Sequence, residues 1–303
     1  MSLVSLVRIK ETDAHSIERA IERSADLIQF YFNKNIRKIA IKPNLCYYYD
    51  YSTGKTTDPR FVGATIDFLR ERISTNAEIF IVESDASAMR CRYVFKMLGY
   101  EKMAKEKDAV LVNLSKDKSN EVLIRNRHRS HRFLIPQTIA EADFVVNIPV
   151  IKCRPYPLRI SCALKNIYGC NAYPRKAKYH DSLDEVIVRL NKIIKTDLCI
   201  VDGIIADVGT PLRLGLVMAS RDPVAIDAVA SAILGYDPEK VRHIALAFKE
   251  RIGNIHLNLA GEDLNHFKIC YAKRPRTNRF GNFPFSNIIR SIYHSYFGKT
   301  KDV

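Results

Sequence analysis

A lysine and an asparagine follow a short apolar run in the sequence Lys42-Pro-Asn44. The run has the composition of a buried strand, and the proline directs the chain out of the sheet where the strand ends. Both side chains can donate hydrogen bonds to an anion. Asp58 and Pro59 have the pattern of a helix N-cap and first helical residue, and free N–H groups at a helix start also favour anions. We expect Lys42, Asn44 and Asp58 to contact an anionic ligand, with an ordinary turn and cap as the alternative.

Residues 144–180 contain no acidic side chain. Like charges in one segment repel each other unless water or a bound anion compensates them. We expect Lys152, Lys165 and Asn166 to bind the anion, with a solvated basic loop as the alternative. The segment carries seven cations and four tyrosines: Lys152, Arg154, Arg159, Lys165, Arg175, Lys176, Lys178, Tyr156, Tyr168, Tyr173 and Tyr179.

One histidine and two aspartates are candidates for proton transfer. His180 precedes an amphipathic helix, and imidazole titrates near neutral pH. Asp202 ends an apolar run typical of a buried strand, and Asp222 precedes a proline as the N-cap of a further helix. We expect His180 to be the acid or base, and Asp202 or Asp222 to orient it or hold a metal ion. Packing and capping are the alternatives, and Asp227 either faces the same site or pairs with a basic neighbour.

The seven cysteines are irregularly spaced and include no C-x-x-C pair. If loops from neighbouring strands meet, their thiolates could bind a divalent metal or an iron–sulfur cluster. Free cysteines also serve as small apolar residues, and that alternative stays open. The four candidate ligands are Cys46, Cys153, Cys162 and Cys170.

The elements that position these residues alternate between strand-like and helix-like segments. Such alternation is typical of βαβ units, and ligands bind beyond the carboxyl ends of parallel strands. We therefore expect an α/β fold of three layers, with a mostly parallel sheet and helices on both faces. Residues 1–267 would form one domain, and 268–303 a basic, aromatic C-terminal extension.

Several segments, in this order, resemble the domain-of-unknown-function family numbered 362. The resemblance spans about residues 38–261. Many members of that family carry a ferredoxin-like iron–sulfur segment, which this chain does not have, and Arg154 stands where members often have a histidine. The segments are Lys42–Leu45, Thr57–Pro59, Glu83–Ser84, Ala142–Lys152, Ala163–Cys170 and Ala219–Asp227.

Charge and hydropathy limit the remaining possibilities. Lys and Arg total 48 against 33 Asp and Glu, a formal charge of +15 that favours anionic partners. No apolar run is long enough to span a bilayer, so we expect a cytoplasmic protein. Our leading hypothesis is an enzyme or cofactor-dependent protein that binds an anionic small molecule. The alternatives are a nucleic-acid-binding protein that uses residues 125–132, 154–178 and the tail, and a metal or iron–sulfur protein.

Overall fold

The computed structural model describes residues 1–31, 36–73, 76–86, 88–125, 130–155, 158–173 and 176–269, without the side chains of Ala177 and His180. All of these residues lie in one compact unit, Met1–Ala272. The expected boundary at residue 267 stays a prediction, and residues 270–303 of the expected extension lie outside the described part.

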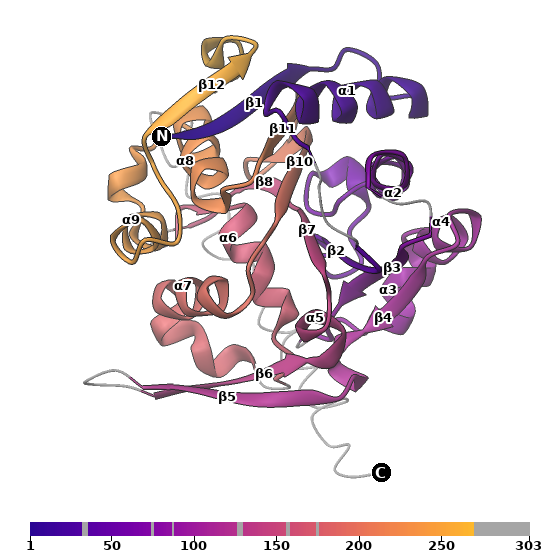
Figure 1. Ribbon diagram of the computed structural model, residues 1–303. Helices are drawn as coiled ribbons and strands as arrows, with labels where there is room; N and C mark the ends of the chain where they lie inside the picture. Colours follow the sequence, from indigo (N-terminus) through magenta and orange to yellow (C-terminus); the bar gives the residue numbers. More distant parts are fainter. Residues whose placement is uncertain are drawn as a thin grey trace, which may run out of the picture. The chain divides into compact units, whose positions relative to one another are not determined.

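The fold is α/β, built on a mixed and mostly parallel sheet, as expected (Figure 1). The strand order is β12-β1-β11-β10-β7-β2-β3-β4, and β8 and β9 branch from β10. Two further strands, β5 and β6, form a separate antiparallel hairpin. The strands are β1 Ser2–Arg8, β2 Lys38–Pro43, β3 Glu78–Glu83, β4 Val110–Asn113, β5 Ser119–Arg125, β6 Ser130–Pro136, β7 Phe144–Ile148, β8 Val150–Cys153, β9 Ile160–Ser161, β10 Leu198–Asp207, β11 Pro211–Ser220 and β12 Leu257–Gly261.

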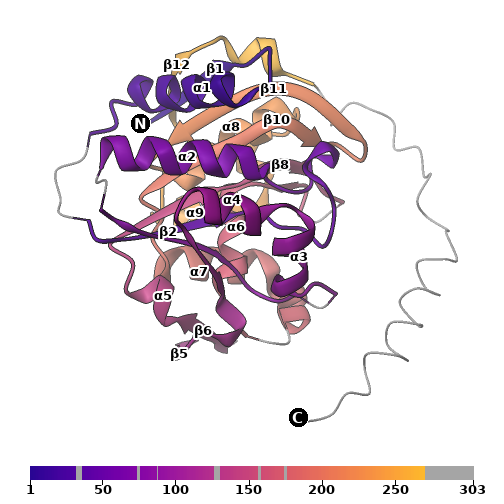
Figure 2. The ribbon, with the colours of Figure 1, turned by 90° about the vertical axis from the view of Figure 1, so that its right-hand side faces the viewer.

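Helices cover both faces of this sheet. One apolar cluster packs α1 to α4 on the first face, and two clusters pack α6 to α9 and the hairpin on the second. Figure 2 shows α1 and α2 side by side on the first face. The α-helices are α1 Ala14–Leu27, α2 Pro59–Arg72, α3 Cys91–Met97, α4 Tyr100–Glu106, α5 Gln137–Ala140, α6 Ala163–Asn166, α7 Leu183–Ile193, α8 Pro223–Ile233 and α9 Arg242–Lys249; the 3-10 helices are η1 Tyr51–Thr53, η2 Leu114–Lys116, η3 Ile167–Cys170, η4 Lys176–Ser182, η5 Pro238–Lys240 and η6 Leu264–Phe267.

The parallel part of the sheet sets the place of the site. Strands β7, β2, β3 and β4 run in the same direction, so their carboxyl ends lie at one edge. Lys42 on β2 is in register with Asn147 on β7, and Asp202 on β10 is in register with Val150 on β8. Three of the residues expected to bind or react, Lys42, Lys152 and Asp202, therefore stand on strands that end at this edge.

The segment between Asp202 and Asp222 forms most of a strand hairpin. The chain continues in β10 as far as Asp207, and β11 returns antiparallel to it, with Ser220 in register with Cys199. Because β11 runs backwards, its carboxyl end lies at the opposite edge of the sheet from Lys42. Asp222 follows that end, and its expected grouping with the lysines is corrected for this reason.

Other local expectations are corrected or confirmed. Two short helices, α3 and α4, flank Gly99, and α3 starts at Cys91. The described part of the basic segment 125–132 belongs to β5 and β6. Both expected N-caps are confirmed, because the carboxylates of Asp58 and Asp222 accept backbone hydrogen bonds from the first turns of α2 and α8.

Candidate functional site

The side chain of Lys42 turns inward from the end of β2. Its Nζ lies 2.6 Å from Oε2 of Glu83 at the end of β3, and both residues are almost fully buried. Gly169, in η3, closes over this ion pair, since a Cβ added there would lie 2.5 Å from Cε of Lys42. Residues 144–180 contain no acidic side chain, so Glu83, from β3, supplies the carboxylate that pairs with Lys42.

Three asparagines connect the strands around this pair. Nδ2 of Asn166 donates to the backbone oxygen of Lys42 at 3.0 Å and to Oδ1 of Asn147 at 2.8 Å. Nδ2 of Asn44 donates to Oδ1 of Asn166 at 3.0 Å. Each amide thus satisfies another buried polar group, which the low local dielectric makes necessary. In this structure Asn44 and Asn166 hold β2, β7 and α6 together at the edge where Lys42 lies.

Two further lysines come from β8 and α6. Lys152 is 3% exposed, and its Nζ donates to the backbone oxygen of Lys55 at 2.7 Å. Burial lowers the pKa of Lys152 to about 7, with added repulsion from Arg154 and Lys165. Burial also lowers the pKa of Lys165, with repulsion from Arg154 and Lys42. Lys165 thus lies within electrostatic range of both Lys152 and Lys42.

Lys176 joins the group, although sequence reasoning named it only among the seven cations of its segment. It is buried, its Nζ donates to the hydroxyl of Ser84, and burial lowers its pKa to about 8. Ser84 in turn donates to the backbone oxygen of Gly169. The position of Lys176 next to Glu83 was not visible in the sequence because the chain between η3 and α7 has no periodic pattern.

We call Lys42, Glu83, Lys152, Lys165 and Lys176 the lysine site. Arg154 lies beside it and pairs with Asp207 at 2.9 Å. The five cations of this neighbourhood face two carboxylates, so an excess of three positive charges remains if every amine is protonated. Among the described residues, the ammonium groups of Lys152, Lys165 and Lys176 have no carboxylate within ion-pair distance.

Asp202 lies beside the start of α2. Its Oδ2 accepts a hydrogen bond from the backbone N–H of Asp58 at 2.9 Å, and burial raises its pKa to about 7. Asp58 itself binds the guanidinium of Arg60 at 2.6 Å. A cavity of about 40 Å³ adjoins both carboxylates and Thr56, whose buried hydroxyl has no hydrogen-bond partner among the described residues. A space of this size holds a few waters.

The other proton-transfer candidates lie elsewhere or outside the described part. Asp222 accepts hydrogen bonds from the hydroxyl of Ser2 and the N–H of Asn254, besides those that cap α8, so its role here is structural. The side chain of His180 lies outside the described residues. Asp227 is buried, with His243 at 3.6 Å, and both of its carboxylate oxygens accept the backbone N–H of Leu164 at 3.3 Å.

The four cysteines proposed as metal ligands do not form a ligand set. Across the described ranges, no group of three or more His, Cys, Asp or Glu is arranged to hold a metal ion. Cys153 and Cys162 pack in the apolar cluster of α8 and α9, whereas Cys170 packs in the cluster of α7 and the hairpin. Cys46 alone lies half-exposed next to the lysine site. The buried cysteines fill the core as small apolar residues.

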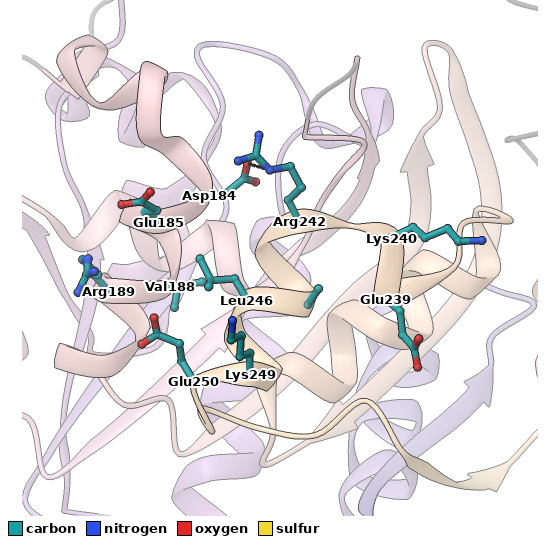
Figure 3. A pocket seen from close by; sticks show the side chains of 11 residues that line it. Asp184, Glu185, Val188, Arg189, Glu239, Lys240, Arg242, Leu246, Lys249 and Glu250 are labelled. Carbon is teal, nitrogen blue, oxygen red and sulfur yellow. Dashed lines mark ion pairs between the residues drawn. The ribbon is translucent and has the colours of Figure 1, made fainter. Parts of the chain in front are cut away.

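A second cavity, of about 520 Å³, lies between α7 and α9 (Figure 3). Four acids and four bases line it, so its charges balance. In Figure 3, Asp184 pairs with Arg242, at 3.5 Å. Because the charges balance, this cavity favours neither an anionic nor a cationic ligand, whereas the lysine site favours an anion. The charged residues are Asp184, Glu185, Glu239, Glu250, Arg189, Lys240, Arg242 and Lys249.

The family model "Domain of unknown function (DUF362)" matches residues 39–232. The chain belongs to the DUF362 family. This confirms the resemblance drawn from the motifs, and the matched residues contain every member of the lysine site. Membership in DUF362 carries no assigned reaction.

One protein similar in sequence and one solved structure similar in fold can be compared with this DUF362 chain. The chain is 34% identical over 126 residues to "Thylakoid-associated protein sll1697" of Synechocystis sp. (strain ATCC 27184 / PCC 6803 / Kazusa); the match covers 37% of this chain and 38% of that protein. It is also similar to the lactate racemase apoprotein from Thermoanaerobacterium thermosaccharolyticum, with a TM-score of 0.46 and 11% identity over 77% of this chain and 57% of that one. Among the described helices of the DUF362 chain, none has both the length and the apolar character to cross a bilayer. The cytoplasmic location stays a prediction.

Proposed function

We propose that this DUF362 chain binds an anionic small molecule at the lysine site and acts on it as an enzyme or cofactor-dependent protein. The observation that supports this most is that three amines of the lysine site, on Lys152, Lys165 and Lys176, have no carboxylate within ion-pair distance among the described residues. Phosphate and carboxylate groups are the ligands that such a set favours.

The physical argument rests on desolvation. A buried ammonium group without a counter-ion is costly, and a protein lowers that cost by releasing the proton. The lowered pKa values of Lys152 and Lys176 follow from this. An anion that enters the site restores the favourable charge pairing, so binding and protonation favour each other. Lys165 is half-buried, which makes it the lysine of the three best placed to meet a ligand that arrives from solvent.

Asp202 is the group whose environment best suits proton transfer near neutral pH. Its carboxyl is buried, and its pKa of about 7 allows it to give or take a proton under ordinary conditions. It lies on β10, whose partner strand β8 carries Lys152. We propose Asp202 as the acid or base. Asp222 caps α8 and has no part in this proposed reaction.

The nucleic-acid alternative has less support. A backbone-binding surface needs exposed cations, yet Lys152 and Lys176 are buried and Arg154 is paired with Asp207. The segment 152–178 was expected to be either a solvated loop or an anion site, and inward-facing lysines favour the second. Parts of the other two basic segments lie outside the described residues.

Calorimetry with inorganic phosphate, pyrophosphate and citrate tests the proposal. The expected result is saturable binding of at least one anion, with affinity lowered tenfold or more by Lys165→Ala. The matched control is Lys102→Ala, which removes the same charge from a side chain that is 83% exposed. Native mass spectrometry of the freshly purified protein would add the identity of any retained ligand. An absence of binding by the wild type, or equal effects of the two substitutions, would contradict the proposal.

A further inference from the structure

Three consecutive tyrosines lie exposed on the loop between β2 and α2. The side chains of Tyr47, Tyr48 and Tyr49 are 44%, 38% and 45% exposed. Single exposed aromatic residues are common, but a contiguous group is not, and such groups often mark a binding surface. We call residues 46–55 the tyrosine loop.

Both ends of the tyrosine loop lie against the lysine site. At one end, the backbone N–H of Leu45, the residue before Cys46, donates to Oε2 of Glu83 at 3.4 Å. At the other end, the backbone oxygen of Lys55 accepts the hydrogen bond from Nζ of Lys152. Gly54 fits the loop closely onto β10, since a Cβ there would lie 2.7 Å from the backbone of Ala206. The tyrosines therefore lie on a loop whose two ends adjoin the lysine site, and the ring of Tyr49 lies next to Lys55 at one of those ends.

The rings are held in a defined arrangement. Tyr47 and Tyr49 meet edge to face, with ring centroids 6.4 Å apart. The ammonium group of Lys55 lies 4.0 Å from the centroid of Tyr49, and the hydroxyl of Tyr48 accepts a hydrogen bond from the backbone of Arg90. Tyr47 has a φ of +52°, a left-handed conformation that a bulky residue seldom adopts. The loop thus presents aromatic faces that are already oriented.

From this placement we infer that the ligand of the lysine site carries a planar aromatic ring together with its anionic group, as a nucleotide does. The inference rests on the proposed function. The phosphate would lie on Lys152 and Lys165, and the base would stack on Tyr47 or Tyr49. Stacking on tyrosine tolerates any base, because every base has a π-face. A bilayer surface would also suit exposed tyrosines, but the adjoining cations are buried, which favours a small ligand.

A comparison of three probes separates the two parts of the ligand. Adenosine monophosphate has ring and phosphate, ribose 5-phosphate has only the phosphate, and adenosine has only the ring. Binding can be followed by calorimetry and by quenching of tyrosine emission, since the chain contains no tryptophan. We expect adenosine monophosphate to bind about tenfold more tightly than ribose 5-phosphate, the gain typical of one base stacked on an aromatic side chain.

Two variants assign that gain to the loop. The double substitution Tyr47→Ala with Tyr49→Ala should make adenosine monophosphate and ribose 5-phosphate bind equally, with the affinity for ribose 5-phosphate unchanged. The conservative pair Tyr47→Phe with Tyr49→Phe should keep the preference. Tyr31→Ala is the matched control, because Tyr31 is 78% exposed and lies outside the loop.

The outcomes distinguish this inference from the proposed function. If both phosphates bind equally to the wild type and Lys165→Ala weakens both, the anion site stands and the aromatic preference is overturned. If neither phosphate binds and other anions also fail, the proposed function falls as well. Binding of anionic phosphatidylserine vesicles that the tyrosine double variant abolishes, without any preference for the nucleotide, would likewise overturn the inference.

Discussion

Nζ of Lys42 and Oε2 of Glu83 lie 2.6 Å apart at the ends of two neighbouring parallel strands, and neither side chain is more than 5% exposed. The same carboxylate also accepts a hydrogen bond from the backbone N–H of Ser84 at 2.9 Å. A buried pair of this kind is held in place by its complete set of partners, since either charge alone would be poorly tolerated.

Glu83→Gln should strongly destabilise the protein. The substitution keeps the shape of the side chain but leaves the ammonium group of Lys42 buried without its counter-ion, at a cost of about 3–5 kcal/mol. Urea unfolding measures the change. Glu11→Gln, at an exposed position, should change stability by less than about 0.5 kcal/mol. Adding Lys42→Met to Glu83→Gln should recover part of the loss, and a single variant as stable as wild type would contradict the argument.

Gly169→Ala should disturb the same pair from the other side. The new methyl group would lie 2.5 Å from Cε of Lys42 and 2.7 Å from Oε1 of Glu83, too close for either to stay in place. Overpacking of this kind costs about 1–3 kcal/mol, and anion affinity should fall with it. Gly63→Ala, in the middle of α2, is the control. Its methyl group would lie 3.4 Å from Met103 of α4, an ordinary contact distance. That change should be neutral or stabilising in the same unfolding experiment.

Anion affinity should fall as the pH rises. Burial sets the pKa of Lys152 to about 7 and that of Lys176 to about 8, so both amines lose their protons between pH 6 and 9. Sulfate is the suitable probe because its own charge does not change over this range. We expect its dissociation constant to rise tenfold or more. Lys152→Arg should move the decline to higher pH, since the guanidinium stays protonated. An affinity independent of pH would show that these amines do not hold the anion.

Asp202 should make the free energy of unfolding decrease between pH 4 and 7. Its pKa is raised from the ordinary 3.8 to about 7 by burial, so the folded protein binds more protons than the unfolded chain across that window. Stability therefore falls as pH rises, by roughly 1–4 kcal/mol from this group. The variant Asp202→Asn lacks this titrating group. Its loss of stability between pH 4.5 and pH 7.5 should therefore be smaller than that of the wild type, by the same amount. Asp26→Asn, exposed and paired with Arg72, should keep the wild-type difference. If stability changed with pH in the same way in the wild type, Asp202→Asn and Asp26→Asn, the raised pKa of Asp202 would be refuted.

Features fixed by a few adjacent residues could be predicted from the sequence. The caps at Asp58 and Asp222 were predicted because an acidic residue before a proline has one common use at a helix start. Lys42 was expected at the end of an apolar strand before a proline, and β2 carries it there. Lys152 was expected to follow an apolar strand, whereas it lies within a strand of its own, β8. The α/β class follows from the alternation of strand-like and helix-like runs.

Features that depend on distant residues could not be predicted. Strand β11 returns antiparallel to β10 after a bulge in β10, and this return puts Asp222 at the opposite edge of the sheet from Lys42. Neither the bulge nor the strand direction leaves a periodic pattern in the sequence. Glu83 was noted as part of a motif and not as the partner of Lys42, 41 positions away in the chain. Which of the seven cations in 152–178 turn inward is decided by Ser84, Lys55 and Asp207, each far along the sequence.

The place of β1 has a consequence for the order in which the protein can fold. This strand pairs with β11 on one side and β12 on the other, so its partners begin about two hundred residues later in the chain. On a ribosome, β1 would emerge on the order of ten seconds or more before either neighbour exists. The side chains of Val4 and Leu6, which are fully buried in the folded protein, have no native partners for that time and are open to non-native apolar contacts.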